Sequence, residues 1–351
     1  MAGGTGGHVY PALAVAERLR AQGLDVSWLG TRKGLEARLV PARGFEIDWI
    51  RAEGLRRSGW RRLVRAPLVL SGALWEAGRA LRRRRPCVVL GMGGFASGPG
   101  GVLARILGIP LVVHEQNSVP GLTNRWLASI ASRVLEAFPG SFGPERRALA
   151  CGNPVRAEIA SLSAPAARFA ERAGPLRLLV LGGSLGAQAL NTQVPAALAL
   201  LPPERRPEVR HQAGQGKQEA TEAAYRAAGV GAEVQPFLED MAAAYAWADL
   251  VICRSGALTV SELAAAGLGA LLVPYPHAVD DHQTRNGAYL VDARAARILP
   301  QAELDAQRLA GELAQLLTDR TGLLAMAQAA RDLAQPESAE QVAKVCREFC
   351  L

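Results

Sequence analysis

The sequence predicts an α/β protein with two doubly wound, Rossmann-like domains that face one another across a cleft. Its 351 residues allow about two domains. Short apolar runs alternate with helical patterns along the chain, which is typical of parallel sheets with helical crossovers. Glycine clusters directly follow several of these runs, and ligands of such folds bind beyond the carboxyl ends of the strands.

The first half of the chain shows this alternation clearly and carries glycine-rich loops at residues 3–7 and 91–94. We expect strands at residues 25–30, 46–50, 87–91, 110–114 and 133–138. We expect helices at residues 11–22, 61–84, 101–107 and 122–130.

The second half repeats the pattern after a break. Between residues 152 and 175 the alternation gives way to a stretch rich in Ser, Ala and Pro, which predicts a domain boundary. We therefore expect one domain at residues 1–154, a second at 155–335, and a C-terminal helix at 336–351 that crosses back to the first. The strands expected in the second domain are residues 176–181, 208–212, 233–237, 249–253, 270–274 and 296–299.

The net charge of +8 indicates an anionic partner, and its distribution is uneven. From Leu55 to Arg85 the sequence contains ten arginines and a single acid, Glu76. Trp60 and Trp75 lie in the same segment, and a basic amphipathic helix with tryptophan is typical of a membrane-surface element. The alternatives are a solvated basic helix whose apolar face belongs to the core, or a patch that binds nucleic acid.

The five cysteines lack paired spacing, so we expect reduced thiols that bind no metal. They are Cys87, Cys151, Cys253, Cys346 and Cys350. No signal peptide opens the chain, and the apolar run at 66–75 is about half of the ~20 residues that a membrane-spanning helix needs.

The first glycine loop leads into a helix that we expect to begin near Pro11. The start of a helix offers unpaired N–H groups and a partial positive charge, which suit a phosphate or a developing anion. His8 lies at this point, and its side chain can accept a proton near neutral pH. The alternative interpretation is a glycine-rich turn with a capping histidine.

Three polar segments follow predicted strands of the second domain. Residues 182–186 include Ser184 and can hold a pyrophosphate, or they form an ordinary strand-to-helix turn. Thr259 and Glu262 match a capping box, whereas a carboxylate at 262 could instead bind a sugar diol. Residues 277–286 invite a metal interpretation, but no rigid element holds three ligands, so a polar loop that contacts the ligand is preferred.

The chain contains no Asp-x-Asp pair of the kind that holds a divalent cation in many sugar-nucleotide enzymes. We therefore expect no metal and no cofactor, with helix ends and side chains neutralising a leaving group. In the first domain the residues from His114 to Asn117 form a further site edge, where Asn117 could bind a sugar hydroxyl or stabilise the loop.

With these motifs in this order, the chain resembles the MurG family of bacterial glycosyltransferases over nearly its whole length. The resemblance rests on residues 3–8 (GGTGGH), 93–100 (GGFASGPG), 114–117 (HEQN), 152–156 (GNPVR), 182–184 (GGS), 254–262 (RSGALTVSE) and Gln283. It implies a GT-B fold and an inverting transfer of N-acetylglucosamine from UDP-N-acetylglucosamine to lipid I, the lipid-linked muramyl-pentapeptide, to form lipid II.

The resemblance also implies roles for individual residues. Arg156 and Ser184 are expected near the donor diphosphate, Leu238 at the uracil, Glu262 at the ribose and Gln283 at the sugar. We expect His8 to be the general base, with Glu115 as the alternative, or no strict base. The remaining substrate contacts implied are Thr5, Gly6, Gly7, Asn117, Ala257, Leu258, Thr259, Val260 and Ser261.

The family has a β-strand before its first glycine loop, for which Met1 and Ala2 leave no room. We therefore expect that strand to be missing and the loop near His8 to lose its anchor. The expected partners are UDP-N-acetylglucosamine, lipid I, an anionic membrane surface on the cytoplasmic face of the cell membrane and other cell-wall enzymes, but not nucleic acid. The competing functions are a UDP-sugar epimerase of the same fold and a basic adaptor protein.

Overall fold

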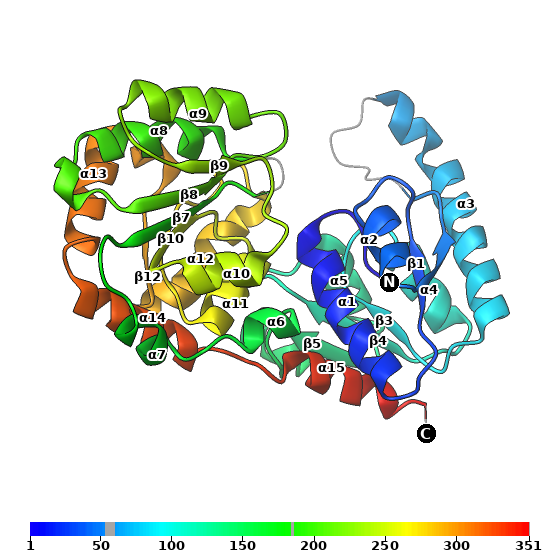
Figure 1. The fold of residues 1–351 in the computed structure, drawn as a ribbon. Helices are drawn as coiled ribbons and strands as arrows, with labels where there is room; N and C mark the ends of the chain where they lie inside the picture. Colours follow the sequence, from blue (N-terminus) through cyan, green and yellow to red (C-terminus); the bar gives the residue numbers. More distant parts are fainter. Residues whose placement is uncertain (53–59, 184–185, 351) are drawn as a thin grey trace. The chain divides into compact units, whose positions relative to one another are not determined.

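The computed structural model describes residues 1–52, 60–183 and 186–350 of the chain, which divides into two compact units (Figure 1). The first unit comprises Met1–Arg156 together with Gln335–Leu351, and the second comprises Ala157–Ala334. The boundary thus lies two residues beyond the predicted one, and Arg156 belongs to the first unit rather than to the second.

The first unit alternates helices and strands, and the five strands predicted for this half lie within two residues of their expected bounds. A sixth strand, β6, has only two residues and carries no recognisable pattern. The elements of this unit are α1 (Gly6–Ala21), β1 (Ser27–Gly30), α2 (Glu36–Ala42), β2 (Glu46–Trp49), α3 (Trp60–Arg84), β3 (Val89–Gly91), α4 (Ser97–Ile106), β4 (Leu111–Glu115), α5 (Leu122–Leu127), β5 (Arg133–Glu136), η1 (Pro144–Arg146), β6 (Leu149–Ala150) and α15 (Ser338–Arg347).

The strands of the first unit form two parallel sheets. One has the order β1-β2 and the other the order β3-β4-β5-β6. Strand β4 is buried along its full length, as its continuous apolar run predicts. Polar residues that follow β3 and β4 therefore emerge at one edge of the same sheet, because the strands are parallel neighbours.

The first described helix is α1, and Met1 and Ala2 precede it without forming a strand. The loss of anchorage expected for the glycine loop is nevertheless wrong. The backbone N–H of Met92 donates to the carbonyl oxygen of Met1 at 2.9 Å, and Trp28 Nε1 donates to that of Ala2 at 2.9 Å. The residues before the loop are thus held from both β1 and the end of β3.

Helix α15 returns to the first unit and packs along α1 (Figure 1). Val342, Ala343 and Cys346 are buried in the same apolar cluster as Val9 and Leu13 of α1. The predicted C-terminal amphipathic helix is present, and its apolar face is covered by the unit that contains the first glycine loop.

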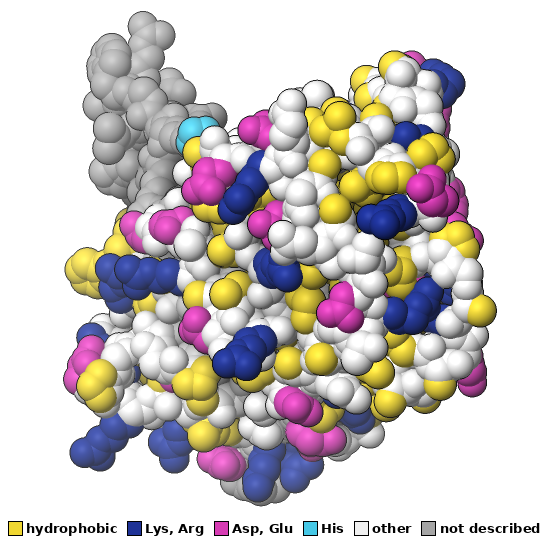
Figure 2. Space-filling view, turned by 90° about the vertical axis from the view of Figure 1, so that its left-hand side faces the viewer, with side chains coloured by type: hydrophobic (Ala, Val, Ile, Leu, Met, Phe, Trp, Pro, Cys, Tyr) yellow, Lys and Arg dark blue, Asp and Glu magenta, His cyan; other side chains and the backbone are white. Residues whose placement is uncertain are grey.

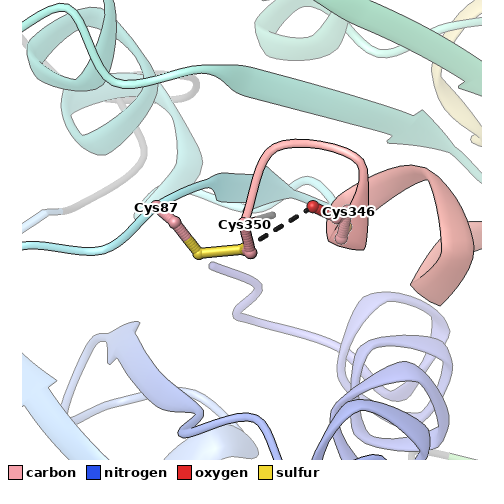
Figure 3. The surroundings of a disulfide bond; sticks show 3 residues. All are labelled: Cys87, Cys346 and Cys350. Atoms are coloured by element: carbon pink, nitrogen blue, oxygen red, sulfur yellow. Dashed lines mark hydrogen bonds between the residues drawn. A yellow bond between two sulfur atoms is a disulfide. The ribbon is translucent and has the colours of Figure 1, made fainter.

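The expectation of fully reduced cysteines is wrong for one pair. Cys87, just before β3, and Cys350, just after α15, form a disulfide, and the Cα atoms are 5.1 Å apart (Figure 3). The two residues are 263 positions apart in the sequence, so spacing could not reveal the pair. Cys151, Cys253 and Cys346 are buried free thiols.

The second unit is a single parallel sheet of six strands in the order β12-β11-β10-β7-β8-β9. All six predicted strands are confirmed to within two residues. Its elements are α6 (Ala157–Ala160), α7 (Pro165–Ala170), β7 (Arg177–Leu181), α8 (Gln188–Ala199), η2 (Pro203–Arg205), β8 (Glu208–Gln212), α9 (Gln218–Ala227), β9 (Glu233–Gln235), α10 (Met241–Trp247), β10 (Leu250–Cys253), α11 (Ala257–Ala266), β11 (Gly269–Leu272), η3 (Val279–Asp281), α12 (His282–Asp292), β12 (Ala296–Ile298), η4 (Gln301–Glu303), α13 (Ala306–Leu316) and α14 (Arg320–Asp332).

The strand order of the second unit reverses direction between β7 and β10. The chain proceeds from β7 to β8 and β9 on one side, and then crosses back to β10 on the other side of β7. Such a switch point opens a crevice beyond the carboxyl ends of the two strands, where ligands of open α/β sheets bind. The doubly wound class predicted from the sequence is therefore confirmed for this unit.

None of the described helices has an apolar stretch long enough to cross a lipid bilayer.

Candidate active site

The two glycine loops of the first unit meet backbone to backbone. Gly93 and Gly94 follow β3 with φ values of 90° and 82°, in the left-handed region that favours glycine. A Cβ atom on Gly94 would lie 2.3 Å from the carbonyl oxygen of Gly3. A Cβ atom on Gly93 would lie 2.8 Å from the ring of His8. Both glycines are therefore required for the loop to approach residues 3–8.

Helix α1 begins at Gly6, so the prediction of a start near Pro11 is wrong. Thr5 is the N-cap residue, with extended backbone, and its carbonyl oxygen accepts the N–H groups of His8 and Val9 at 3.2 Å. Pro11 lies inside the helix, where it removes a single backbone donor. His8 consequently lies within the first helical turn rather than before it, beside the N–H groups of Gly6 and Gly7.

A buried carboxylate that the sequence analysis missed organises this loop. Glu36 is fully buried at the start of α2, and its Oε2 atom accepts the backbone N–H of Gly4 at 2.9 Å. Its Oε1 atom accepts the N–H and the hydroxyl of Thr31 at 3.0 and 2.7 Å. The available signal was an acid that follows Gly30 and Gly34, because both glycines leave room for its side chain.

The side chain of His8 is connected to β4 by a chain of hydrogen bonds. His8 Nδ1 lies 2.7 Å from Gln116 Oε1, and Gln116 Nε2 lies 3.0 Å from Nδ1 of His114. His114 Nε2 lies 2.9 Å from the carbonyl oxygen of Gly152. The structure thus brings the predicted base together with two residues of the segment from His114 to Asn117.

Glu115, the alternative base, has a different environment. Its side chain is 1 % exposed and accepts four N–H donors. Asn117 donates to Oε1 through its backbone and side-chain nitrogens at 2.9 and 3.1 Å. Gly121 N and Asn124 Nδ2 donate to Oε2 at 3.1 and 2.9 Å. These four bonds engage both oxygens of the carboxylate and fix the loop that follows β4, and the choice between His8 and Glu115 as the base stays a prediction.

Arg156 packs against the helix that carries His8. Its guanidinium group lies 4.9 Å from the ring centroid of Tyr10 in α1, a distance that allows a cation–π interaction. This contact places a positive charge two residues along α1 from His8. The expected role of Arg156 near the donor diphosphate stays a prediction.

In the second unit, two backbone loops flank the switch point. The loop after β7 turns at Gly183 and Gly186, with φ values of 79° and 69°. A Cβ atom on Gly186 would lie 2.0 Å from the carbonyl oxygen of Ala213, so only glycine fits there. The predicted contact Ser184 lies outside the described residues. Helix α8 begins just beyond this loop, and α11 begins beyond β10, so both helix starts lie at the switch point.

The capping-box interpretation of Thr259 and Glu262 is wrong. The N-cap residue of α11 is Gly256, which has no side chain to cap the helix, and both residues of the motif lie inside the helix. Glu262 is 4 % exposed, and its Oε2 atom accepts the hydroxyl of Tyr245 at 3.1 Å. Tyr245 therefore holds this carboxylate in position, and the expected contact of Glu262 with a ribose diol stays a prediction.

The other predicted contacts on α11 differ in burial. Ala257 and Val260 are buried, and the backbone N–H of Val260 donates to the carbonyl oxygen of Gly256 at 2.9 Å. Leu258, Thr259 and Ser261 are half-buried, and the Ser261 hydroxyl donates to the carbonyl oxygen of Ala257 at 3.0 Å. Leu238, the expected uracil contact, is 8 % exposed in the loop that precedes α10.

Side chains that the prediction omitted join the loops after β10 and β11. Arg254 donates to the carbonyl oxygens of Val273 and Pro274 at 2.9 and 3.1 Å. Asn286 of α12, fully buried, donates to the carbonyl oxygen of Ser255 at 3.3 Å. Gln283 was predicted, and its Oε1 atom accepts the backbone N–H of Tyr275 at 2.9 Å. These three side chains thus hold the loops that follow the neighbouring strands β10 and β11.

The segment from His277 to Asn286 does not assemble a cluster of ligands. In the part of the chain that the structure describes, no group of three His, Cys, Asp or Glu side chains is arranged to hold a metal ion. Asp281 instead accepts the hydroxyl of Thr284 at 2.7 Å.

Comparison with known proteins agrees with this architecture. Residues 1–136 match the glycosyltransferase family 28 N-terminal domain, and residues 177–344 match the glycosyltransferase family 28 C-terminal domain. A curated protein of Nitrosococcus oceani, named UDP-N-acetylglucosamine–N-acetylmuramyl-(pentapeptide) pyrophosphoryl-undecaprenol N-acetylglucosamine transferase, is 58% identical over 348 residues, 99% of this chain and 97% of the relative.

Two solved structures extend the comparison. The crystal structure of Acinetobacter baumannii MurG is 42% identical, with a TM-score of 0.85 over 99% of this chain and 98% of that one. A UDP-GlcNAc 2-epimerase from Neisseria meningitidis has a TM-score of 0.69 over 98% of each chain at 10% identity, which shows a shared fold alone. The predicted GT-B fold is confirmed, and the chain belongs to the MurG family of N-acetylglucosamine transferases within glycosyltransferase family 28.

Proposed function

We propose that this protein transfers N-acetylglucosamine from UDP-N-acetylglucosamine to lipid I and so forms lipid II. The observation that carries the proposal is the switch point of the second unit, where α8 and α11 both begin beyond adjacent strands. A relative named for this reaction supports the proposal, because it is 58% identical over 99% of this chain.

The second unit supplies the chemistry that a nucleoside diphosphate requires. The N-termini of α8 and α11 offer backbone N–H groups and a partial positive charge to the diphosphate. The Glu262 carboxylate, held by Tyr245, is suited to a ribose diol. Because the N–H groups at the two helix starts neutralise charge as UDP leaves, the proposed reaction needs no cation from the segment from His277 to Asn286.

The proposed reaction is one in-line displacement at the anomeric carbon of the sugar. A bond forms from the acceptor hydroxyl oxygen to that carbon, while the bond from the carbon to the phosphate oxygen of UDP breaks. His8 takes the proton of the attacking hydroxyl as the general base. The helix start at Gly6 and Gly7 lies beside it and favours negative charge on the acceptor side.

Incubation of the full chain with labelled UDP-N-acetylglucosamine and a lipid I analogue, without added metal, tests this proposal. We expect labelled disaccharide product together with UDP. An epimerase would instead release an isomerised sugar without needing lipid I, and a binding protein would give no product. Either of these outcomes would overturn the proposal.

We also propose that the protein associates with a membrane. The segment predicted for this role, from Leu55 to Arg85, is described only in part. Residues 53–59 and the side chains of 60–68 lie outside the described part of the segment from Leu55 to Arg85. Within the described part, Arg83 and Arg84 form ion pairs with Asp48, and Arg84 also binds Glu46. These two arginines are therefore engaged within the protein.

A further exposed apolar surface lies on α4 and α5, which pack against each other. Ile106 and Trp126 are 70 % and 72 % exposed, and exposed arginines, Arg105 and Arg125, precede each of them. Exposed apolar side chains rimmed by cations are typical of a surface that binds an anionic leaflet. We propose that this α4–α5 surface docks on the cytoplasmic face of the membrane, close to the lipid-linked acceptor.

The competing hypothesis of a basic adaptor protein would require a gathered basic surface, and the face of the second unit in Figure 2 does not show one. Basic and acidic side chains are interspersed on that face. Arg297 pairs with Glu312 at 3.0 Å and Arg210 pairs with Glu233 at 2.9 Å within this unit. Nucleic-acid binding would need basic side chains gathered in a patch or stripe.

A further inference from the structure

The orientation of the Gln116 side-chain amide is set by a neighbour that can only accept. Gln116 Nε2 lies 3.0 Å from the carbonyl oxygen of His114 and 3.0 Å from His114 Nδ1. A carbonyl oxygen has no proton, so the NH₂ group must face it, and the amide cannot be flipped without losing this bond. The side chain is 1 % exposed, so water cannot replace the bond.

This orientation determines which nitrogen of His8 carries the proton. The remaining atom of the amide, Gln116 Oε1, lies 2.7 Å from His8 Nδ1. Because an amide oxygen only accepts, Nδ1 must donate, and a neutral imidazole with its proton on Nδ1 has its lone pair on Nε2.

The position of the proton on His114, at the other end of this chain of hydrogen bonds, is determined in the same way. His114 Nε2 lies 2.9 Å from the carbonyl oxygen of Gly152, which also can only accept, so His114 carries its proton on Nε2. Its Nδ1 atom therefore receives the second N–H of Gln116. Burial lowers the pKa of His114 to about 4, so the ring is neutral near neutral pH and keeps this acceptor.

The ring of His8 is also confined sterically. Gly93 packs against it so closely that a Cβ atom there would lie 2.8 Å from both Cε1 and Nδ1. The backbone of Gly93 has a φ of 90°. Ring position and protonation are thus determined by different neighbours.

We infer that Gln116 is a positioning residue, which holds the proton of His8 on Nδ1 and so presents Nε2 as the base toward the acceptor hydroxyl. The inference rests on the proposed function for the role of Nε2. In the transfer step the acceptor O–H bond breaks, its proton goes to Nε2, and Nδ1 keeps its own proton on Gln116 Oε1. An amide can direct the ring in this way without adding the negative charge that a carboxylate would place beside it.

The protonation pattern can be measured without any enzymatic assay. Long-range ¹H–¹⁵N correlation spectra of the full chain, labelled with ¹⁵N-histidine, distinguish the two tautomers for each of the five histidines. The His8 signals are assigned from their absence in His8→Gln. We expect the Nδ1–H form for His8 and the Nε2–H form for His114. The opposite tautomer of His8 in the wild-type protein would overturn the inference.

Substitution then separates positioning from packing. Gln116→Met keeps the shape of the side chain and removes its three hydrogen bonds, so we expect both tautomers of His8 and a turnover about 10-fold to 100-fold lower. Gln116→Glu keeps an oxygen toward His8, so we expect the Nδ1–H form to persist and turnover to recover in part. UDP affinity should stay unchanged in both variants, because the residue lies in the first unit.

Gln22→Met is the matched control. Its side chain lies at the other end of α1 and donates to Glu340 at 2.7 Å, so we expect wild-type turnover and an unchanged His8 spectrum. Full turnover in Gln116→Met would contradict the inference, as would tautomers that do not respond to either substitution. A chain that shows the expected tautomers but transfers no sugar would refute the proposed function alone.

Discussion

The backbone N–H of Gly4 donates to Oε2 of the fully buried Glu36 at 2.9 Å, across 32 residues of sequence. This bond and the bond from the Leu35 N–H to the carbonyl oxygen of Gly4 at 3.2 Å join the glycine loop to the start of α2. The glycine loop that leads into α1, the helix of His8, therefore depends on a carboxylate in a different element.

Glu36→Gln tests this dependence. The new NH₂ group would face either the Gly4 N–H or the Thr31 donors, so one buried donor loses its acceptor. We expect the free energy of unfolding to fall by about 1–3 kcal/mol and turnover to fall while UDP affinity is retained. Urea denaturation, initial rates and UDP calorimetry measure these quantities. Glu17→Gln, on the exposed side of α1, should change none of them.

Tyr245→Phe tests the support of Glu262. The substitution keeps a buried ring and removes only the hydroxyl that donates to Oε2 at 3.1 Å. Because a hydrogen bond to a charged group contributes about 1.5 kcal/mol or more, we expect UDP to bind about 10-fold more weakly in calorimetry. Tyr225→Phe is the matched control, since it removes the buried hydroxyl beside His211. Equal UDP affinity in both variants would remove Tyr245 from the donor site.

Reduction of the disulfide should loosen the first unit. The bond closes a loop of 263 residues, and loop closure of that length contributes up to about 5 kcal/mol in the chain-entropy model. We expect dithiothreitol to lower the melting temperature of the wild-type protein and to raise its count of titratable thiols in denaturant from three to five. Cys350→Ser should melt at the lower temperature with or without reductant. A melting temperature that ignores the reductant in the wild-type protein would contradict this prediction.

The second unit should lose stability in mild acid through His211. Burial lowers the pKa of this ring to about 3, from an ordinary value of 6.5. Below pH 6.5 the unfolded chain binds a proton that the folded chain does not, so stability present above pH 6.5 is lost as the pH falls toward 3. The slope is at most about 1.4 kcal/mol per pH unit for one group. In urea denaturation at pH 7.5 and 5.0, we expect His211→Gln to lose less stability between the two values than the wild-type protein does. Equal losses would show that another group is responsible.

The α4–α5 surface should govern binding to anionic vesicles. Ile106→Ser combined with Trp126→Ser removes two exposed apolar side chains. Since burial of each contributes about 1.5–3 kcal/mol, we expect at least a 10-fold loss of co-sedimentation with vesicles that contain phosphatidylglycerol. Leu200→Ser, an exposed leucine of the second unit, is the control and should not alter binding. Undiminished co-sedimentation of the double variant would place the docking surface elsewhere.

Much of the fold was predictable because its signals are local. Continuous apolar runs identified the buried strands, such as β7 and β10, and glycines at residues 93 and 186 marked places where the backbone must pass close to another chain segment. The start of α1 was misjudged because Pro11 resembles a helix start, and nothing local shows that the helix tolerates it five residues further in. The capping box failed for a similar reason, since Gly256 begins the helix one turn earlier.

The sequence by itself determined the alternation of strands and helices, the two-domain organisation and the segments that follow the strands. Only the tertiary structure decided which of those segments act together. Glu36 reaches Gly4, Gln116 directs the ring of His8, and Cys87 meets Cys350, although each pair is separated by 32 to 263 residues. Backbone periodicity is encoded within a few residues, whereas the partner of a buried polar atom depends on how distant elements pack, and no local pattern specifies that packing.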